Sequence, residues 1–233
     1  MDSIKRQARI AGALYVLLAV IAPVGLIYVP GKMIVSGDAV ATAENVRMSE
    51  SLFRVGIASE LGSQIIVIFL VLALYKLFKP VDDMLAKQLV ILGALVSVPI
   101  MFLNVVNEVA ALVLVGDAGF LSTFERPQLD SLAYLFLRLH GQGTTVASVF
   151  WGLWLFPFGL LVIRCGFIPR FLGFLLLVAG TAYVVSAFAT LIVPSYSTAV
   201  GRVALPLEMA ELPIILWLAI WGARARSNQP LAT

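Results

Sequence analysis

Several ionisable side chains lie inside stretches of sequence that are otherwise apolar and long enough to cross a bilayer. The most informative are Glu60, Glu108, His140 and Glu211. A charged group is costly inside a membrane, so each of these residues is a candidate for function. At a helical rise of about 1.5 Å per residue, Glu60 lies roughly 13 Å, Glu108 roughly 10 Å and Glu211 roughly 9 Å from the outer end of its stretch. This similar depth predicts one polar cavity, in the outer half of the membrane.

Amide side chains follow the same pattern at helical spacing. Asn104, Asn107 and Glu108 stand at positions i, i+3 and i+4, which lie on one side of a helix. Arg138 precedes His140 by two residues in the fourth stretch. The expected ligand-binding residues are therefore Glu60, Asn104, Asn107, Glu108, Arg138, His140 and Glu211.

Such a group of side chains permits several kinds of chemistry. The carboxylates and His140 could relay protons. A divalent metal could be bound by Glu60, Glu108, Glu211 and His140. One imidazole is, however, fewer nitrogen ligands than zinc sites usually have. Arg138 could instead hold the anionic head of a ligand. The same polar groups could also do no more than link helices by hydrogen bonds. We therefore assign no catalytic residue and predict no cofactor, with a divalent metal left as an option.

Several common active-site motifs are absent from the sequence. The chain has one histidine, His140, and one cysteine, Cys165. It contains no HExxH, GxSxG or CxxC motif. These absences exclude haem held by two histidines, disulfide exchange within the chain and hydrolases that need several histidines.

Composition identifies the class of protein. Of the 233 residues, 61% are hydrophobic and 12% are charged, against about 45–50% and about 25% in soluble domains. The net charge is only +3, without a run of Lys and Arg that could follow a phosphate backbone. These values exclude a soluble enzyme, a disordered chain and a nucleic-acid-binding domain. The expected partner is the lipid bilayer, and a homo-oligomer or a second membrane protein is left open.

Six stretches are apolar over the length of about 20 residues that a transmembrane helix needs. We expect an all-α, polytopic membrane protein, in which one domain over residues 1–233 forms a six-helix transmembrane bundle. Asp38 is expected to cap a short helix in the loop after the first span. The expected spans are residues 10–29, 51–78, 88–115, 135–163, 171–193 and 205–221.

The distribution of basic residues predicts the orientation. An excess of Lys and Arg marks the cytoplasmic loops of membrane proteins. With the N-terminus inside, ten of the 16 basic residues fall on the cytoplasmic side, so both termini are expected in the cytoplasm. Those ten are Lys5, Arg6, Arg9, Lys76, Lys79, Lys87, Arg164, Arg170, Arg224 and Arg226.

Three segments resemble one family of bacterial membrane proteins. They are Ala8-Arg-Ile-Ala-Gly-Ala-Leu-Tyr15, Glu50-Ser-Leu-Phe-Arg-Val-Gly-Ile-Ala-Ser59 and Arg164-Cys-Gly-Phe-Ile-Pro-Arg-Phe-Leu-Gly173. In these segments the chain is similar to the family described as domain of unknown function 4386 (DUF4386). The resemblance implies a multi-pass protein of the bacterial cytoplasmic (inner) membrane and carries no activity, cofactor or catalytic residue with it.

The leading functional hypothesis is that the chain binds, senses or passes a small ligand or ion through the polar cavity. One alternative is a membrane-embedded enzyme that acts on a lipid or isoprenoid, with or without a metal. Another is a structural subunit of a membrane complex. The sequence alone leans away from an enzyme, because it contains none of the catalytic motifs above.

Overall fold

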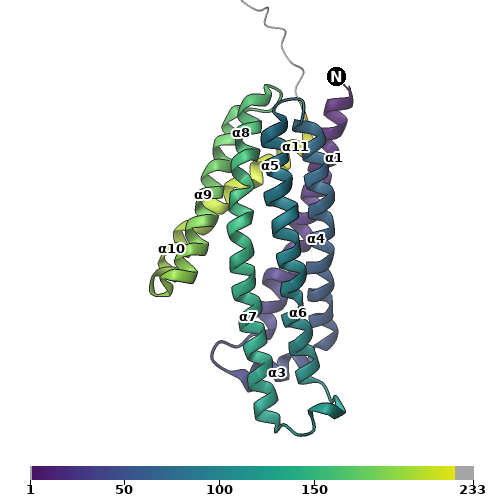
Figure 1. The fold of residues 1–233 in the computed structure, drawn as a ribbon, viewed down its shortest axis with the longest axis vertical. Coiled ribbons are helices and arrows are strands. Elements are labelled where there is room, and N and C mark those ends of the chain that lie inside the picture. The colour runs from purple at the N-terminus through teal and green to yellow at the C-terminus, as the bar shows by residue number, and fades with distance from the viewer. Residues whose placement is uncertain (1, 224–233) are drawn as a thin grey trace, which may run out of the picture. The chain divides into compact units, whose positions relative to one another are not determined.

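A computed structural model describes residues 2–223 of the chain. All regular elements in this range are helices, which confirms the all-α prediction (Figure 1). Six helical stretches of the described range are long and apolar enough to cross a membrane, as predicted. They are Ser3–Met33, Glu50–Phe78, Asp83–Val115, Arg126–Cys165, Arg170–Ile192 and Pro194–Ile220. Arg224 and Arg226, two of the basic residues expected inside, lie outside the described residues.

The last span differs most from its expected bounds. It was expected to begin near residue 205, but the helix begins at Pro194. The polar residues after Pro194 lower the local hydropathy, whereas the proline itself suits the first turn of a helix because that position needs no N–H donor. The first turns of the span are therefore helical without being apolar.

The described chain divides into two compact units; one division falls between Val96 and Ser97, and the other three fall within long helices. These helices are α1 (Asp2–Pro23), α4 (Glu50–Phe78) and α7 (Arg126–Leu153). Unit 1 contains the chain up to Val16, Val67–Val96 and the chain from Ser148 onward, and unit 2 contains Leu17–Ile66 and Ser97–Ala147.

Unit 1 packs through close contacts between glycines. Its own elements are α5 (Asp83–Val90), the π-helix η2 (Ile91–Val96), α8 (Leu155–Cys165), α9 (Arg170–Ile192), α10 (Pro194–Glu208), the 3₁₀ turn η4 (Met209–Glu211) and α11 (Leu212–Ile220). A Cβ atom on Gly152 would lie 2.6 Å from the carbonyl oxygen of Gly180, and one on Gly173 would lie 2.6 Å from that of Gly159. These contacts agree with the small-residue packing expected between membrane helices.

Unit 2 holds the polar residues that the spacing singled out in spans two, three and four. Its own elements are the π-helix η1 (Val24–Tyr28), α2 (Val29–Met33), α3 (Ala39–Met48), α6 (Ser97–Val115) and the 3₁₀ turn η3 (Gly119–Leu121). Asp38 caps α3 as predicted, because its carboxylate accepts a hydrogen bond from the N–H of Ala41 at 2.9 Å. Arg47 of α3 pairs with the buried Asp130 of α7 at 2.7 Å.

Apolar side chains fill the interior of unit 2 on one side of the polar residues. The buried members of this core are Val29, Met33, Ala43, Val46, Phe53, Ala111, Val115, Ala133 and Leu137. They come from α2, α3, α4, α6 and α7, so this core holds five helices in place around the polar side chains described next.

Candidate functional site

Three helices bring two carboxyl groups and an imidazole together within unit 2. Glu60 comes from α4, Glu108 from α6 and His140 from α7. Both glutamates are only 1% exposed, and His140 is 7% exposed. One ligand atom of each residue lies within 4.8 Å of the ligand atoms of the other two. We call these three residues the Glu-Glu-His cluster.

The carboxylates of this cluster lack the hydrogen bonds that buried carboxylates usually have. Among the described residues, no hydrogen bond reaches Glu60 Oε2 or Glu108 Oε2. Glu60 Oε1 has one close polar neighbour, His140 Nε2, at 3.2 Å. Buried charged groups are normally paired or bound to metal. The cluster therefore has unused capacity to bind a cation.

His140 is held by the main chain of a neighbouring helix. Its Nδ1 lies 3.3 Å from the carbonyl oxygen of Asn104. A carbonyl oxygen can only accept, so Nδ1 carries the hydrogen of this bond. In the neutral ring the lone pair is then on Nε2, the atom that faces Glu60.

Asn104 joins α6 to α7 just beside the cluster. Its Nδ2 donates to the carbonyl oxygen of His140 at 2.9 Å and to Thr144 Oγ1 at 3.1 Å. A Cβ atom on Gly143 would overlap the side chain of Asn104, so the glycine makes the room for this amide. Asn107 donates in turn to the carbonyl oxygen of Asn104 at 3.1 Å. The two amides thus position the imidazole through the backbone of α6 and α7.

The π-helix η1 approaches Glu60 more closely than an ordinary residue would allow. A Cβ atom on Gly25 would lie 2.6 Å from Glu60 Cγ and 2.7 Å from the carbonyl oxygen of Gly56. The N–H of Gly25 donates to Ser59 Oγ at 3.2 Å, and Ser59 Oγ donates to the carbonyl oxygen of Ile21 at 2.7 Å. Isolated π-helical turns are frequent at functional sites. Sequence reasoning missed Gly25 and Ser59, although the small residues Gly25 and Gly56 were a signal of close helix approach.

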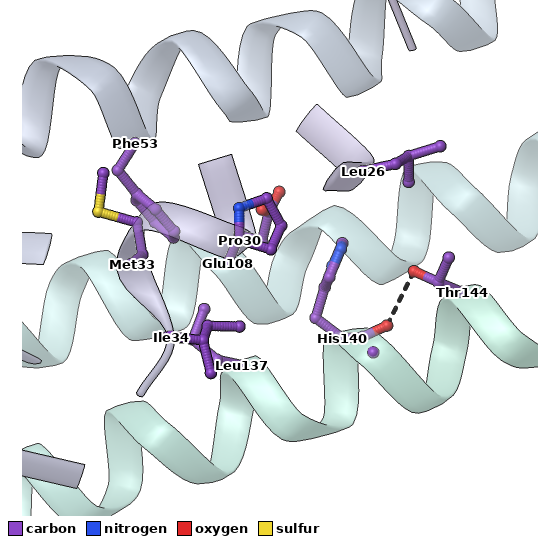
Figure 2. Close-up of a pocket in the computed structure, with 10 residues that line it drawn as sticks. Leu26, Pro30, Met33, Ile34, Phe53, Glu108, Leu137, His140 and Thr144 are labelled. Atoms are coloured by element: carbon purple, nitrogen blue, oxygen red, sulfur yellow. Dashed lines mark hydrogen bonds between the residues drawn. The ribbon is translucent and has the colours of Figure 1, made fainter. Parts of the chain in front are cut away.

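A cavity of about 250 Å³ adjoins the cluster (Figure 2). Glu108, His140 and Thr144 supply its polar lining, and none of its lining residues in the described chain is Lys or Arg. The remaining lining residues are Leu26, Pro30, Met33, Ile34, Phe53, Leu137 and Gly141. Pro30 has no N–H, so it cannot donate the regular helical hydrogen bond to the carbonyl oxygen of Leu26. The first span is therefore irregular where it borders the cavity. The cavity is thus mostly apolar, and its polar lining is limited to these three residues of α6 and α7.

Arg138, Glu211 and Asn107 were also predicted as site residues, and none of them is a member of the Glu-Glu-His cluster. Arg138 is exposed on α7 and is not part of the cavity lining. Glu211 belongs to unit 1, where the hydroxyl of Tyr15 donates a hydrogen bond to its carboxylate. Asn107 is partly buried and takes part through Asn104. Of the expected residues, the structure thus gathers Glu60, Glu108 and His140, with both asparagines beside them.

Comparison with family models gives a match to a domain of unknown function, DUF4386, over residues 10–222. The chain belongs to the DUF4386 family. The match confirms the expected resemblance and covers nearly the whole chain, including all three cluster residues of this DUF4386 protein. No curated protein and no solved structure matches the chain.

Proposed function

We propose that this DUF4386 protein is a membrane protein that binds a cation at the Glu-Glu-His cluster. The observation that carries the proposal is the pair of almost fully buried glutamates whose Oε2 atoms accept no hydrogen bond from any described residue. A buried carboxylate without a partner is destabilising, because burial removes its hydration and nothing replaces it. A bound cation supplies the missing partner.

The surroundings favour a cation over an anionic ligand. Two carboxylates make the electrostatic potential of the cluster negative. The positive side chain that would be needed for an anion, Arg138, is exposed and lies outside the cavity lining. The proposal therefore keeps the carboxylates and His140 as binding groups and gives Arg138 no contact with the ligand.

Thermal unfolding in mild detergent tests this proposal. Magnesium, manganese, cobalt, zinc, ammonium and tetramethylammonium chlorides would be added separately at constant ionic strength. At a concentration 100 times the dissociation constant, a ligand stabilises the folded state by about 2.7 kcal/mol. In a chain of this size such a gain raises Tm by roughly 5–10 °C. We expect at least one of these cations to raise the Tm of the wild-type protein.

Two variants show where that cation binds. Glu108→Gln removes a charge from the cluster, whereas Glu44→Gln removes one from an exposed position on α3. We expect the stabilisation to disappear in Glu108→Gln and to persist in Glu44→Gln. If no cation stabilises the wild-type protein, or if Glu108→Gln responds in the same way, the proposal is wrong.

We further propose that the protein lies in the bacterial cytoplasmic membrane with both termini in the cytoplasm. The excess of Lys and Arg on that side supports this orientation. An even number of candidate spans, six in the described chain, also supports termini on the same side of the membrane. Within unit 1, Arg9 near the start of the chain donates to the carbonyl oxygen of Ile220 at the end of the last helix, at 3.1 Å. This contact also agrees with termini on the same side.

A further inference from the structure

We infer that the cation is a divalent transition-metal ion, bound by one carboxylate oxygen each of Glu60 and Glu108 and by Nε2 of His140. This inference rests on the cation site proposed above and names the class of its ligand. The geometry of the three ligand atoms, the hydrogen bond of His140 and the charge of the cluster support it.

The separations of the ligand atoms suit a single ion. Metal–oxygen and metal–nitrogen bonds of about 2.0–2.2 Å place neighbouring ligand atoms about 3.0–3.5 Å apart and opposite ones about 4.2 Å apart. His140 Nε2 and Glu60 Oε1 are already 3.2 Å apart. All three ligand atoms lie within 4.8 Å of one another. These separations are close to those that the ligands of one ion require.

The hydrogen bond of His140 has the form found at metal sites. A histidine that binds a metal usually donates its other ring N–H to a carboxylate or a backbone carbonyl, which fixes the tautomer and the ring orientation. Here Nδ1 lies 3.3 Å from the carbonyl oxygen of Asn104, and Nε2 faces the cluster. The chain thus presents the lone pair of Nε2 to the space between the two carboxylates.

Charge and size favour a divalent ion over other cations. Two carboxylates and a neutral imidazole carry a formal charge of −2, which a divalent ion balances and a monovalent ion leaves half compensated. Uncompensated charge is costly at a buried site. Ligand atoms within 4.8 Å of one another leave room for an atomic ion but not for an organic ammonium group between them. An organic cation would therefore have to remain in the cavity, outside the cluster.

The type of ligand atoms narrows the metal further. Magnesium and calcium prefer oxygen ligands alone, whereas imidazole suits zinc, iron, nickel and copper. Three protein ligands leave at least one coordination position open, as in zinc sites that bind substrate or water. Glu108 and His140 line the cavity, so an open position would face that space. The mostly apolar lining suits a small ligand with one oxygen or nitrogen donor atom.

Metal uptake by the full-length protein tests the inference. The wild-type protein in mild detergent would be treated with a chelator, loaded with ZnCl₂ or CoCl₂, passed through a desalting column and analysed for metal by mass spectrometry. Cobalt(II) adds a second readout, because its visible absorption reports nitrogen and oxygen ligands. We expect one metal ion per chain in the wild-type protein, with a cobalt spectrum that zinc abolishes.

Matched variants separate the cluster from adventitious surface sites. Glu60→Gln, Glu108→Gln and His140→Gln each remove one ligand, and we expect each to weaken metal binding at least about tenfold. Glu44→Gln should bind metal as the wild-type protein does. Glu108→Asp keeps the charge but shortens the side chain, and it provides a conservative variant if Glu108→Gln does not fold. We expect Glu108→Asp to bind metal more weakly than wild type, with an altered cobalt spectrum.

The outcomes distinguish this inference from the proposed function. If ammonium or tetramethylammonium stabilises the wild-type protein through Glu108 while no metal is retained, the site binds a cation but the metal inference is wrong. If neither metal nor any other tested cation binds, both are wrong. Equal metal uptake by the wild type and all cluster variants would assign the metal to surface groups and would also overturn the inference.

Discussion

At the scale of single residues, the space around the cluster is set by glycines as much as by polar groups. Gly143 and Gly141 lie two positions apart on α7, on either side of Gln142. A Cβ atom on Gly143 would overlap the side chain of Asn104, whereas one on Gly141 would meet no atom within 4 Å. The amide that joins α6 to α7 beside His140 therefore depends on the absence of a side chain at Gly143.

We expect Gly143→Ala to destabilise the protein and to weaken cation binding. The added methyl group displaces Asn104, and overpacking of this kind costs about 1–3 kcal/mol. Displacement of Asn104 also disturbs its bonds to the His140 carbonyl and to Thr144. Thermal unfolding with and without cobalt chloride measures both effects.

Gly141→Ala is the matched control for this prediction. It adds the same methyl group in open space, where alanine favours the helix by up to about 1 kcal/mol over glycine. We expect its Tm to equal or exceed that of the wild-type protein. An equal loss of stability in both variants would contradict the role assigned to Asn104.

At the scale of elements, the first span is not one regular helix. The π-helix η1 and the short helix α2 follow α1 directly, with no loop residue between them. The N–H of Gly25 leaves the regular pattern to donate to Ser59 Oγ on α4, next to Glu60. Pro30 then prevents a regular bond to the carbonyl of Leu26 beside the cavity. The irregular backbone thus lies where the span borders the candidate site.

We expect Gly25→Ala to move Glu60 and so to weaken metal binding as well as lower Tm. Its Cβ would lie 2.6 Å from Glu60 Cγ and 2.7 Å from a backbone oxygen of α4, and backbone atoms cannot move aside as a side chain can. Gly31→Ala, in α2 of the same span, meets nothing within 4 Å and serves as the control. Metal titration of both variants measures the difference. Unchanged affinity in Gly25→Ala would show that η1 does not position Glu60.

At the scale of the whole molecule, the orientation in the membrane can be measured by labelling single introduced cysteines, once the chain's own cysteine is removed. Cys165 is buried and is the only cysteine, so Cys165→Ala provides a background for single introduced cysteines. Asp117→Cys adds an exposed thiol in the loop after α6, and Met84→Cys adds one at the start of α5. The two positions lie at opposite ends of the third span.

We expect a membrane-impermeant maleimide added to intact spheroplasts to label Asp117→Cys and not Met84→Cys. The reason is that the loop after the third span lies outside when the N-terminus is cytoplasmic, and the loop before it lies inside. Lysed spheroplasts, in which both variants should be labelled, control for accessibility. The reverse pattern of labelling would mean that both termini lie outside.

The sequence by itself was enough to predict the six spans, the all-α class, the cap at Asp38 and the family. These features depend on local properties: apolar length, helix caps and short motifs. It also identified Glu60, Glu108 and His140 as embedded polar residues, because their types and positions can be read without a partner. The start of the sixth helix at Pro194 was missed, because its first turns are polar.

Only the tertiary structure decided which of these polar groups meet. The rotation of each helix about its axis sets whether a side chain faces the interior, and spans rich in apolar residues on every side contain little information about that rotation. Packing in unit 2 turns Glu60, Glu108 and His140 toward one another and leaves Arg138 exposed, whereas Glu211 has Tyr15 as its partner in unit 1. The glycines that permit these approaches act through neighbours far away in the sequence, so their roles appear only once the helices are packed.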